Sequence, residues 1–298
     1  MLSSRNYAPA SRLLPFVRRF YMFDAKLPDS FELEDMLLSD NAFVRVLLKG
    51  DWAHLDPDGN WTPLSGAMVF GANSRAVRVR VKGPFSVASF AVRPSAWPAL
   101  FSTPAADFAD RIVPLSALWD ADISAPVETE IPKAATDSEM AALMTRAIEQ
   151  QLARVGVNQI DPIVAAFEAI ARNDSTARVE EAAKLLGLSV RQLERRCLAG
   201  FGLSPKAVLQ RCRFLDMASA MRGLSDADES ELAALRYFDQ SHLNREFRRY
   251  TNMTRRLPAR SDALVHSEPE IAGRRKNARL SQNCTIADSV AGRDSRGF

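Results

Sequence analysis

The sequence has few of the residues that build metal sites, disulfides or phosphate-binding loops. Its cysteines, Cys197, Cys212 and Cys284, are odd in number and form no Cys-x-x-Cys pair. Of its histidines only His54 precedes residue 242, so the N-terminal half cannot build a cluster of histidine and carboxylate ligands. No Gly-x-Ser-x-Gly elbow or glycine-rich phosphate loop occurs. These absences predict a protein with no enzymatic activity, cofactor or metal.

Long apolar runs are also absent. No stretch approaches the roughly 18 residues needed to cross a bilayer, and the first residues, from Met1 to Tyr7, do not form a signal-peptide core. Cys197 and Cys212 lie in apolar helical contexts, which is typical of reduced core thiols. We expect a cytoplasmic protein that makes no membrane contact.

The charge of the chain is unevenly distributed. The 298 residues carry a net charge of +3 and 47% hydrophobic residues, an ordinary composition for two globular domains. Between Ser189 and Arg256, however, thirteen Lys and Arg stand against eight Asp and Glu. The rest of the chain is therefore slightly acidic. A basic C-terminal region suits a nucleic-acid-binding module joined to a second domain.

Residues 13–93 show the patterns of a β-rich domain. The segment 43–48 is a strand candidate, and Asp56-Pro-Asp-Gly-Asn60 is a turn. Valines at 77, 79 and 81 alternate with basic residues, as in a half-buried strand. Lys82-Gly-Pro-Phe85 is expected to turn the chain into a second strand at 86–92, completing a hairpin. Short strands at this spacing favour a small barrel or sandwich.

After this β-rich region, the apolar residues recur at the spacing of a helix. This spacing predicts helices at 105–112 and 139–155, joined by a surface connection between Ala121 and Asp137. Met140, Met144 and Ile148 share one stripe of the second helix, which is either core or a dimer seam. Beyond Pro258 the chain is polar, and 261–298 is predicted to be a disordered tail.

Two short helices joined by a glycine turn come next. The apolar spacing of 179–186 predicts an amphipathic helix that ends at Gly187. Ser189 can cap a second helix, 190–199, whose buried side holds Leu193 and Cys197. The opposite side of this helix presents Arg191, Glu194, Arg195 and Leu198. This arrangement is typical of a helix-turn-helix unit, and a generic helical hairpin with a solvated arginine face is the alternative.

Three segments together resemble the DNA-binding domain of the AraC/XylS family. They are Ser189-Val-Arg-Gln-Leu-Glu-Arg195, Gly202-Leu-Ser-Pro-Lys206 and Arg211-Cys-Arg-Phe-Leu-Asp-Met-Ala218. The family's second helix-turn-helix unit is similar to Asp239-Gln-Ser-His-Leu-Asn-Arg-Glu-Phe247. A double motif over about 80 residues is far more specific than one unit. DNA-repair methyltransferases that carry a similar module need N-terminal cysteines, and none precedes Cys197.

The second unit departs from the family pattern at three positions. Arg236 and Asn252 replace glycines, and Arg255 replaces a proline. Base reading is therefore better supported for the first unit than for the second. A continuous helix from Pro205 to Met221, about 25 Å long, is expected between the units as a rigid spacer.

The resemblance implies an α+β chain with a β-rich, cupin-like barrel or sandwich followed by an all-α double helix-turn-helix domain. The expected division is a sensor or dimerisation domain at 1–120, a helical linker at 121–165, a DNA-binding domain at 166–260 and the tail at 261–298. The expected DNA-binding residues are Arg191, Gln192, Glu194, Arg195, Lys206, Gln240, Ser241, His242, Asn244, Arg245, Arg248 and Arg249.

The expected function is sequence-specific transcription regulation, as an activator or as a repressor. Its expected partners are double-stranded DNA, a small-molecule effector, a second copy of the chain and RNA polymerase. Residues Trp52, Trp61, Phe90 and Arg93 are the candidates for an effector site, although such aromatics are more often core. The alternative is a small-molecule-binding β-domain whose helical region no longer reads DNA specifically. Arg236 and Arg255 keep that alternative open.

Overall fold

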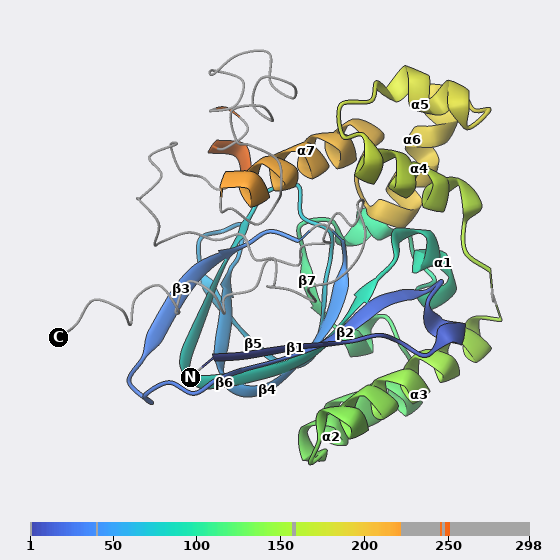
Figure 1. Cartoon of the computed structure of the whole chain (residues 1–298). Helices are drawn as coiled ribbons and strands as arrows, with labels where there is room; N and C mark the ends of the chain where they lie inside the picture. Colours follow the sequence, from blue (N-terminus) through green and yellow to red (C-terminus); the bar gives the residue numbers. More distant parts are fainter. Residues whose placement is uncertain (1, 40, 157–158, 222–244, 246–247, 251–298) are drawn as a thin grey trace.

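The computed structural model describes residues 2–39, 41–156, 159–221, 245 and 248–250 (Figure 1). The strands are β1 (Leu2–Tyr7), β2 (Val17–Ala25), β3 (Glu32–Leu37), β4 (Phe43–Leu55), β5 (Trp61–Phe70), β6 (Val77–Val92) and β7 (Ile112–Pro114). The α-helices are α1 (Trp97–Leu100), α2 (Ala121–Thr129), α3 (Asp137–Val155), α4 (Pro162–Asn173), α5 (Val179–Leu185), α6 (Val190–Phe201) and α7 (Pro205–Met221). Short 3₁₀ turns are η1 (Ser11–Leu13), η2 (Pro94–Ala96), η3 (Ala105–Phe108), η4 (Leu115–Ala117) and η5 (Ile131–Lys133).

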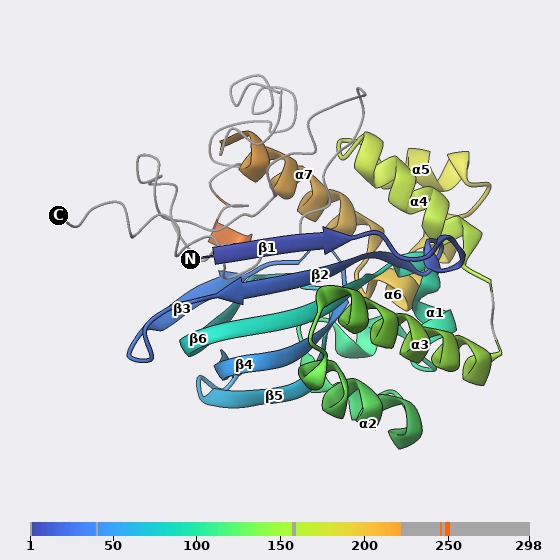
Figure 2. The same cartoon turned by 60° about the horizontal axis from the view of Figure 1, so that its bottom comes forward.

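The N-terminal domain is one antiparallel sheet of seven strands. The strand order is β1-β2-β6-β4-β5-β7. Strand β3 pairs with the first part of β6, and β2 pairs with the later part of the same strand. The sheet is strongly curved, with α2 and α3 on one face (Figure 2). The sheet-rich prediction for 13–93 is confirmed, and β1 and β7 extend the sheet on both sides of that range.

Each face of the sheet carries its own apolar cluster. The inner cluster includes Phe23, Phe43, Trp52 and Phe85. The outer cluster is covered by helices, and it joins strand residues such as Phe90 to a layer from α1, α2 and α3. That helical layer includes Met144, Ala147, Ile148 and Leu152, so the apolar stripe of α3 is core. Because successive side chains along a strand point to opposite sides of the sheet, the strands contribute residues to both clusters.

A bulge in β4 keeps its side chains on the correct faces along its whole length. The register with both neighbouring strands shifts between Leu47 and Trp52. Gly50 lies inside this shift with φ +99°, and a Cβ placed on it would lie 2.7 Å from the Cβ of Phe85. Odd-numbered Phe43 and even-numbered Trp52 therefore both face the inner cluster.

The expected hairpin at Lys82–Phe85 is wrong. Residues 77–92 form the single strand β6, which bends at Gly83, where φ is +77°. The Gly83 N–H donates to the carbonyl of Phe31 at 2.7 Å, so β3 pairs before the bend and β2 pairs after it. The alternation that predicted burial of Val79 and Val81 is confirmed.

Two further sequence expectations are corrected. The predicted helix at 105–112 is only the short turn η3, after which Ile112 begins β7. The predicted surface connection from Ala121 holds the helix α2, although Pro126 lies inside it. Ile123, Val127 and Ile131 repeat every four residues and are buried, so the helical signal was present despite the proline.

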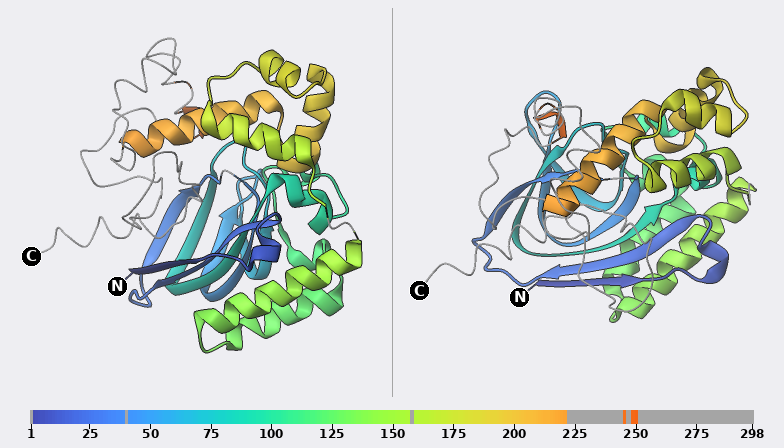
Figure 3. Two further views of the ribbon diagram at one scale, coloured as in Figure 1. Left: turned by 45° about the vertical axis from the view of Figure 1, so that its right-hand side comes forward. Right: turned by 45° about the horizontal axis from the view of Figure 1, so that its top comes forward.

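The C-terminal helices α4 to α7 form a second core. It joins Phe167 of α4, Ala183 of α5, Leu193 of α6 and Val208 of α7. Helix α7 then lies across one end of the sheet domain (Figure 3), where its Phe214 and Leu215 cluster with Leu38. The predicted fold class, an N-terminal β-domain followed by a helical domain, is confirmed. Among the described helices, none is long and apolar enough to span a membrane.

Candidate nucleic-acid interface

Helices α5 and α6 form the expected helix-turn-helix geometry. Gly187 has φ +69° in the turn between them, a conformation that glycine adopts without strain. The Ser189 hydroxyl accepts a hydrogen bond from the Gln192 N–H at 3.3 Å, and the Gln192 side chain accepts one from the Ser189 N–H at 2.8 Å. This reciprocal cap fixes where α6 begins.

The two sides of α6 differ in burial as the sequence predicts. Leu193 and Cys197 are fully buried against α4, α5 and α7, and burial raises the pKa of the Cys197 thiol, which keeps it protonated. The opposite side exposes Arg191, Glu194, Arg195 and Leu198. An anchored helix with a free charged face can enter a groove without losing its own core.

Two polar residues of α6 already have partners within the protein. The side-chain oxygen of Gln192 accepts hydrogen bonds from the N–H and the hydroxyl of Ser189, so this side chain helps to fix the start of α6. Gln192 is also exposed on the surface of the helix. The Arg196 Nη1 donates to Asp161 Oδ2 at 2.8 Å, which ties α6 to the start of α4. Arg196 is therefore a structural arginine, whereas the neighbouring Arg195 has no ion-pair partner within the described part of the chain.

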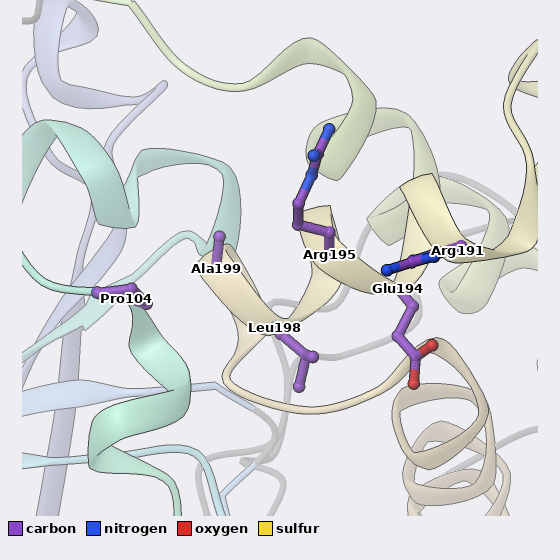
Figure 4. A pocket seen from close by; sticks show the side chains of 6 residues that line it. All are labelled: Pro104, Arg191, Glu194, Arg195, Leu198 and Ala199. Atoms are coloured by element: carbon purple, nitrogen blue, oxygen red, sulfur yellow. The ribbon is translucent and has the colours of Figure 1, made fainter.

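A shallow pocket of about 360 Å³ lies against the exposed face of α6. It is lined by Arg191, Glu194, Arg195, Leu198 and Ala199, with Pro104 of the N-terminal domain as the remaining wall. Figure 4 shows Pro104 beside Ala199, at the C-terminal end of the helix. The two arginines and Glu194 project from the part of α6 nearer its N-terminus (Figure 4).

The C-terminal end of α6 is packed directly against the N-terminal domain. A Cβ on Gly200 would lie 2.6 Å from the carbonyl oxygen of Pro94. A Cβ on Gly202 would lie 2.7 Å from the carbonyl oxygen of Ala105. Only glycine allows the helix to approach the η2 and η3 backbones this closely.

Helix α7 makes a further contact with the N-terminal domain. Its Arg211 is 1% exposed and donates to the backbone oxygen of Asn73 at 3.3 Å. The side chain of Asn73 in turn accepts hydrogen bonds from the backbone and hydroxyl of Ser39. Lys206, at the start of α7, is exposed as a phosphate contact requires.

Part of the second unit is described. Arg245, Arg248 and Arg249 are exposed, and Arg249 donates to Gln210 Oε1 of α7 at 3.1 Å. Tyr250 is buried against Phe214, with the ring centroids 4.8 Å apart. The expected DNA-binding residues Gln240, Ser241, His242 and Asn244 lie outside the described residues. So do Arg236, Asn252, Arg255, Cys284 and the tail at 261–298.

Comparison with protein families identifies this region. Residues 182–256 match a family described as a helix-turn-helix domain. The chain carries an AraC-type helix-turn-helix domain. The match covers α6, α7 and the region of the second unit, so it confirms the resemblance and the prediction of a DNA-binding transcription regulator. Residues 5–114 match a domain of unknown function (DUF6597). No curated protein sequence matches the chain significantly.

Several solved structures are similar to this chain at low identity. ToxT from Vibrio cholerae aligns with 11% identity and a TM-score of 0.46, over 79% of this chain and 96% of ToxT. ToxT of strain SCE256 with bound unsaturated fatty acid aligns with 14% identity and a TM-score of 0.44, over 79% and 92% of the two chains. A cupin superfamily protein from Desulfitobacterium hafniense has 13% identity and a TM-score of 0.23, over 31% and 77%.

The four expected effector residues do not converge on one cavity. Trp52 lies in the inner cluster, edge-on to Phe85, while Phe90 lies in the outer cluster beside Trp119. Trp61 is only partly buried, and the guanidinium groups of two neighbouring arginines lie over its ring.

The fourth expected effector residue, Arg93, also has a structural partner. It donates to the carbonyl of Leu14 at 2.6 Å, and burial lowers the pKa of its guanidinium. It thus helps to hold the chain that precedes β2. An effector role for these four residues stays a prediction.

Sequence reasoning missed the residues that join α6 to the N-terminal domain. Gly200 lies within α6, where glycine is about 1 kcal/mol less favourable than alanine. A glycine at such a position indicates close approach by another backbone, and this signal was available. Pro104 gave no comparable signal, because its place beside α6 depends on long-range packing.

Proposed function

We propose that this protein regulates transcription by placing α6 in a DNA major groove, where Arg191, Glu194 and Arg195 read bases. The exposed face of α6, held by its buried side and its N-terminal cap, carries this proposal. An arginine can donate two parallel hydrogen bonds to the O6 and N7 atoms of guanine. A glutamate can accept a hydrogen bond from the cytosine amino group.

The second unit extends the contact along the DNA. Helix α7 has 17 residues and is about 25 Å long, which is compatible with two readers in successive major grooves about 34 Å apart. Lys206, Arg248 and Arg249 contact phosphates in this arrangement, and Gln240, Ser241, Asn244 and Arg245 approach the second groove. His242 makes a backbone or phosphate contact.

The N-terminal domain controls access of α6 to DNA. A major groove is about 12 Å wide and admits one α-helix of about that diameter. Pro104, which shares a pocket with the reading residues, must therefore stay outside the groove. A change in the packing of η3 against α6 would alter how deeply the helix enters.

Further parts of the sequence expectation remain proposals. These are the homodimer, the contact with RNA polymerase, activation or repression, the cytoplasmic location, the absence of enzymatic activity and the domain limits at 120, 165 and 260. Helix α4 begins at Pro162 and packs on α6 and α7. This packing favours an earlier start for the DNA-binding domain than residue 166.

Selection from a randomised duplex library at physiological salt tests the proposed function. We expect the full-length protein to enrich a motif with two blocks about ten base pairs apart. One enriched block would limit base reading to α6. Absence of any enrichment would overturn sequence-specific binding and favour the alternative, a small-molecule-binding protein whose helical region does not read DNA.

A further inference from the structure

A second pocket lies where the AraC-type domain meets the rim of the β-domain. Its volume is about 280 Å³, and it is lined by the ends of β3 and β4, the turn after β4, the segment 75–78, Asp110 and Arg249. This volume is near the lower limit of ligand clefts, which span roughly 300–1,000 Å³. The pocket therefore suits a small molecule and not a long acyl chain.

The two carboxylates in the lining already have hydrogen-bond donors. Asp110 accepts hydrogen bonds from the backbone N–H of Ser74 at 2.7 Å and from the Ser74 hydroxyl. Asp56 accepts from the Asn60 N–H at 2.8 Å and the Thr62 hydroxyl at 3.1 Å, and the Asn60 bond lowers the pKa of this carboxyl. Both carboxylates thus stabilise loops, and among the described residues neither forms an ion pair with an arginine of the lining.

The three arginines of the lining differ in how far they are engaged. Arg78 pairs with Glu34. Arg249 uses one nitrogen to bond Gln210, and a guanidinium offers five N–H donors in all. Arg75 is exposed, and its side chain forms no hydrogen bond or ion pair with the part of the chain that the structure describes. Arg75 and Arg249 thus leave donors available from both domains.

We propose that this pocket binds a small organic anion, with its carboxylate or phosphate oxygens held by Arg75 and Arg249. Planar guanidinium groups match the oxygen pairs of both anions and form short, charge-assisted hydrogen bonds with them. His54 lines the same pocket, and burial lowers the pKa of its imidazole. It is therefore neutral at pH 7 and can donate one hydrogen bond without adding charge.

Such an anion would also compete with DNA. Arg249 is one of the residues proposed to contact phosphates, so this step rests on the proposed function. An anion that engages Arg249 holds this arginine at the rim of the β-domain and removes one cation from the DNA contact. Anion binding therefore weakens DNA binding.

Titration calorimetry of the full chain with succinate and with inorganic phosphate tests the site. We expect at least one probe to bind with a Kd below about 1 mM, and the better probe identifies the anion class. Arg75→Gln should weaken binding about tenfold or more. Arg146→Gln, an exposed arginine of α3 outside the pocket lining, should leave it unchanged. Absence of binding by both probes, or equal binding by Arg75→Gln, overturns the site.

Fluorescence anisotropy with the selected duplex tests the coupling. Ionic strength is matched with chloride, because salt alone weakens DNA binding. Addition of the better probe should raise the Kd with which the wild-type protein binds DNA. It should leave the Kd of the Arg75→Gln variant for DNA unchanged. An unchanged Kd in the wild type refutes the coupling. If the protein binds no duplex even without the anion, the proposed function is refuted. The calorimetric test of the anion site is independent of that outcome.

Discussion

Gly202 lies so close to Ala105 that a Cβ on the glycine would be 2.7 Å from the alanine carbonyl oxygen. Gly202 ends α6, and Ala105 begins η3 of the N-terminal domain. The helix proposed to read DNA is therefore in direct backbone contact with the β-domain. This contact, with Gly200 against Pro94, gives the β-domain a physical route to influence DNA binding.

Substitution of Gly202 measures this contact. Gly202→Ala should lower the free energy of unfolding by about 1–2 kcal/mol for backbone strain at φ +73°, plus about 1–3 kcal/mol for the clash with Ala105. Gly187→Ala is the matched control, because Gly187 has φ +69° but a Cβ on it would meet no atom within 4 Å. Urea denaturation should show the larger loss for Gly202→Ala. Equal losses would refute the close approach.

Arg195 and Arg196 provide a matched pair for base reading. Arg195→Ala should cost about 1–3 kcal/mol on the selected DNA site and relax specificity at one base pair. Arg196→Ala should leave specificity unchanged, because this side chain is directed to Asp161. Affinity for selected and random duplexes gives both quantities. An equal loss on both duplexes would make Arg195 a phosphate contact.

The cap at Ser189 is expected to support α6 before DNA is present. Ser189→Ala should destabilise the protein by about 1 kcal/mol, because the N–H of Gln192 loses its acceptor. Ser189→Thr retains a hydroxyl and should remain close to the wild type. Thermal denaturation of both variants checks the prediction. A Ser189→Thr variant as unstable as Ser189→Ala would show that the hydroxyl bond is not the stabilising feature.

The local features of this chain could be predicted from sequence. The spacing of Leu193 and Cys197 determined the buried side of α6, and Gly187 and Ser189 marked its boundary with α5. These signals lie within a few residues of the structure they specify. The double motif then identified the DNA-binding domain, which the match over 182–256 confirms.

The features that required tertiary information could not be predicted. Gly83 and Pro84 indicated a hairpin turn, but β2 and β3 pair with successive halves of β6 and keep it extended. Three of the four expected effector residues were aromatics chosen from one region, and strand alternation places two of them, Trp52 and Phe90, on opposite faces of the sheet. The position of Pro104 beside the face of α6 depends on how the two domains pack.

Acid should weaken the attachment of β1 to α3. Hydrogen bonding by Arg5, and secondarily by Tyr7, lowers the pKa of the Asp137 carboxyl below its usual 3.8. A carboxyl with a lowered folded-state pKa contributes stability that is complete above its unfolded pKa and is lost as the pH falls through the folded one. Asp137→Asn should therefore lower the melting temperature at pH 7. The difference from the wild type should shrink below about pH 4, and a difference independent of pH would refute this role.

The ion pair between Arg18 of β2 and Glu168 of α4 should stabilise the junction between the two domains. Both side chains are only 10% exposed, and Arg172 adds a second contact to Glu168 at 3.4 Å. Glu168→Gln removes the charged partner of the largely buried Arg18, and it should cost about 3 kcal/mol. Glu149→Gln is the control, because its pair with Arg12 is exposed to solvent and should contribute little to stability. Urea denaturation compares the two variants. A loss no larger for Glu168→Gln would show that water reaches this pair and that other contacts hold α4 against the sheet.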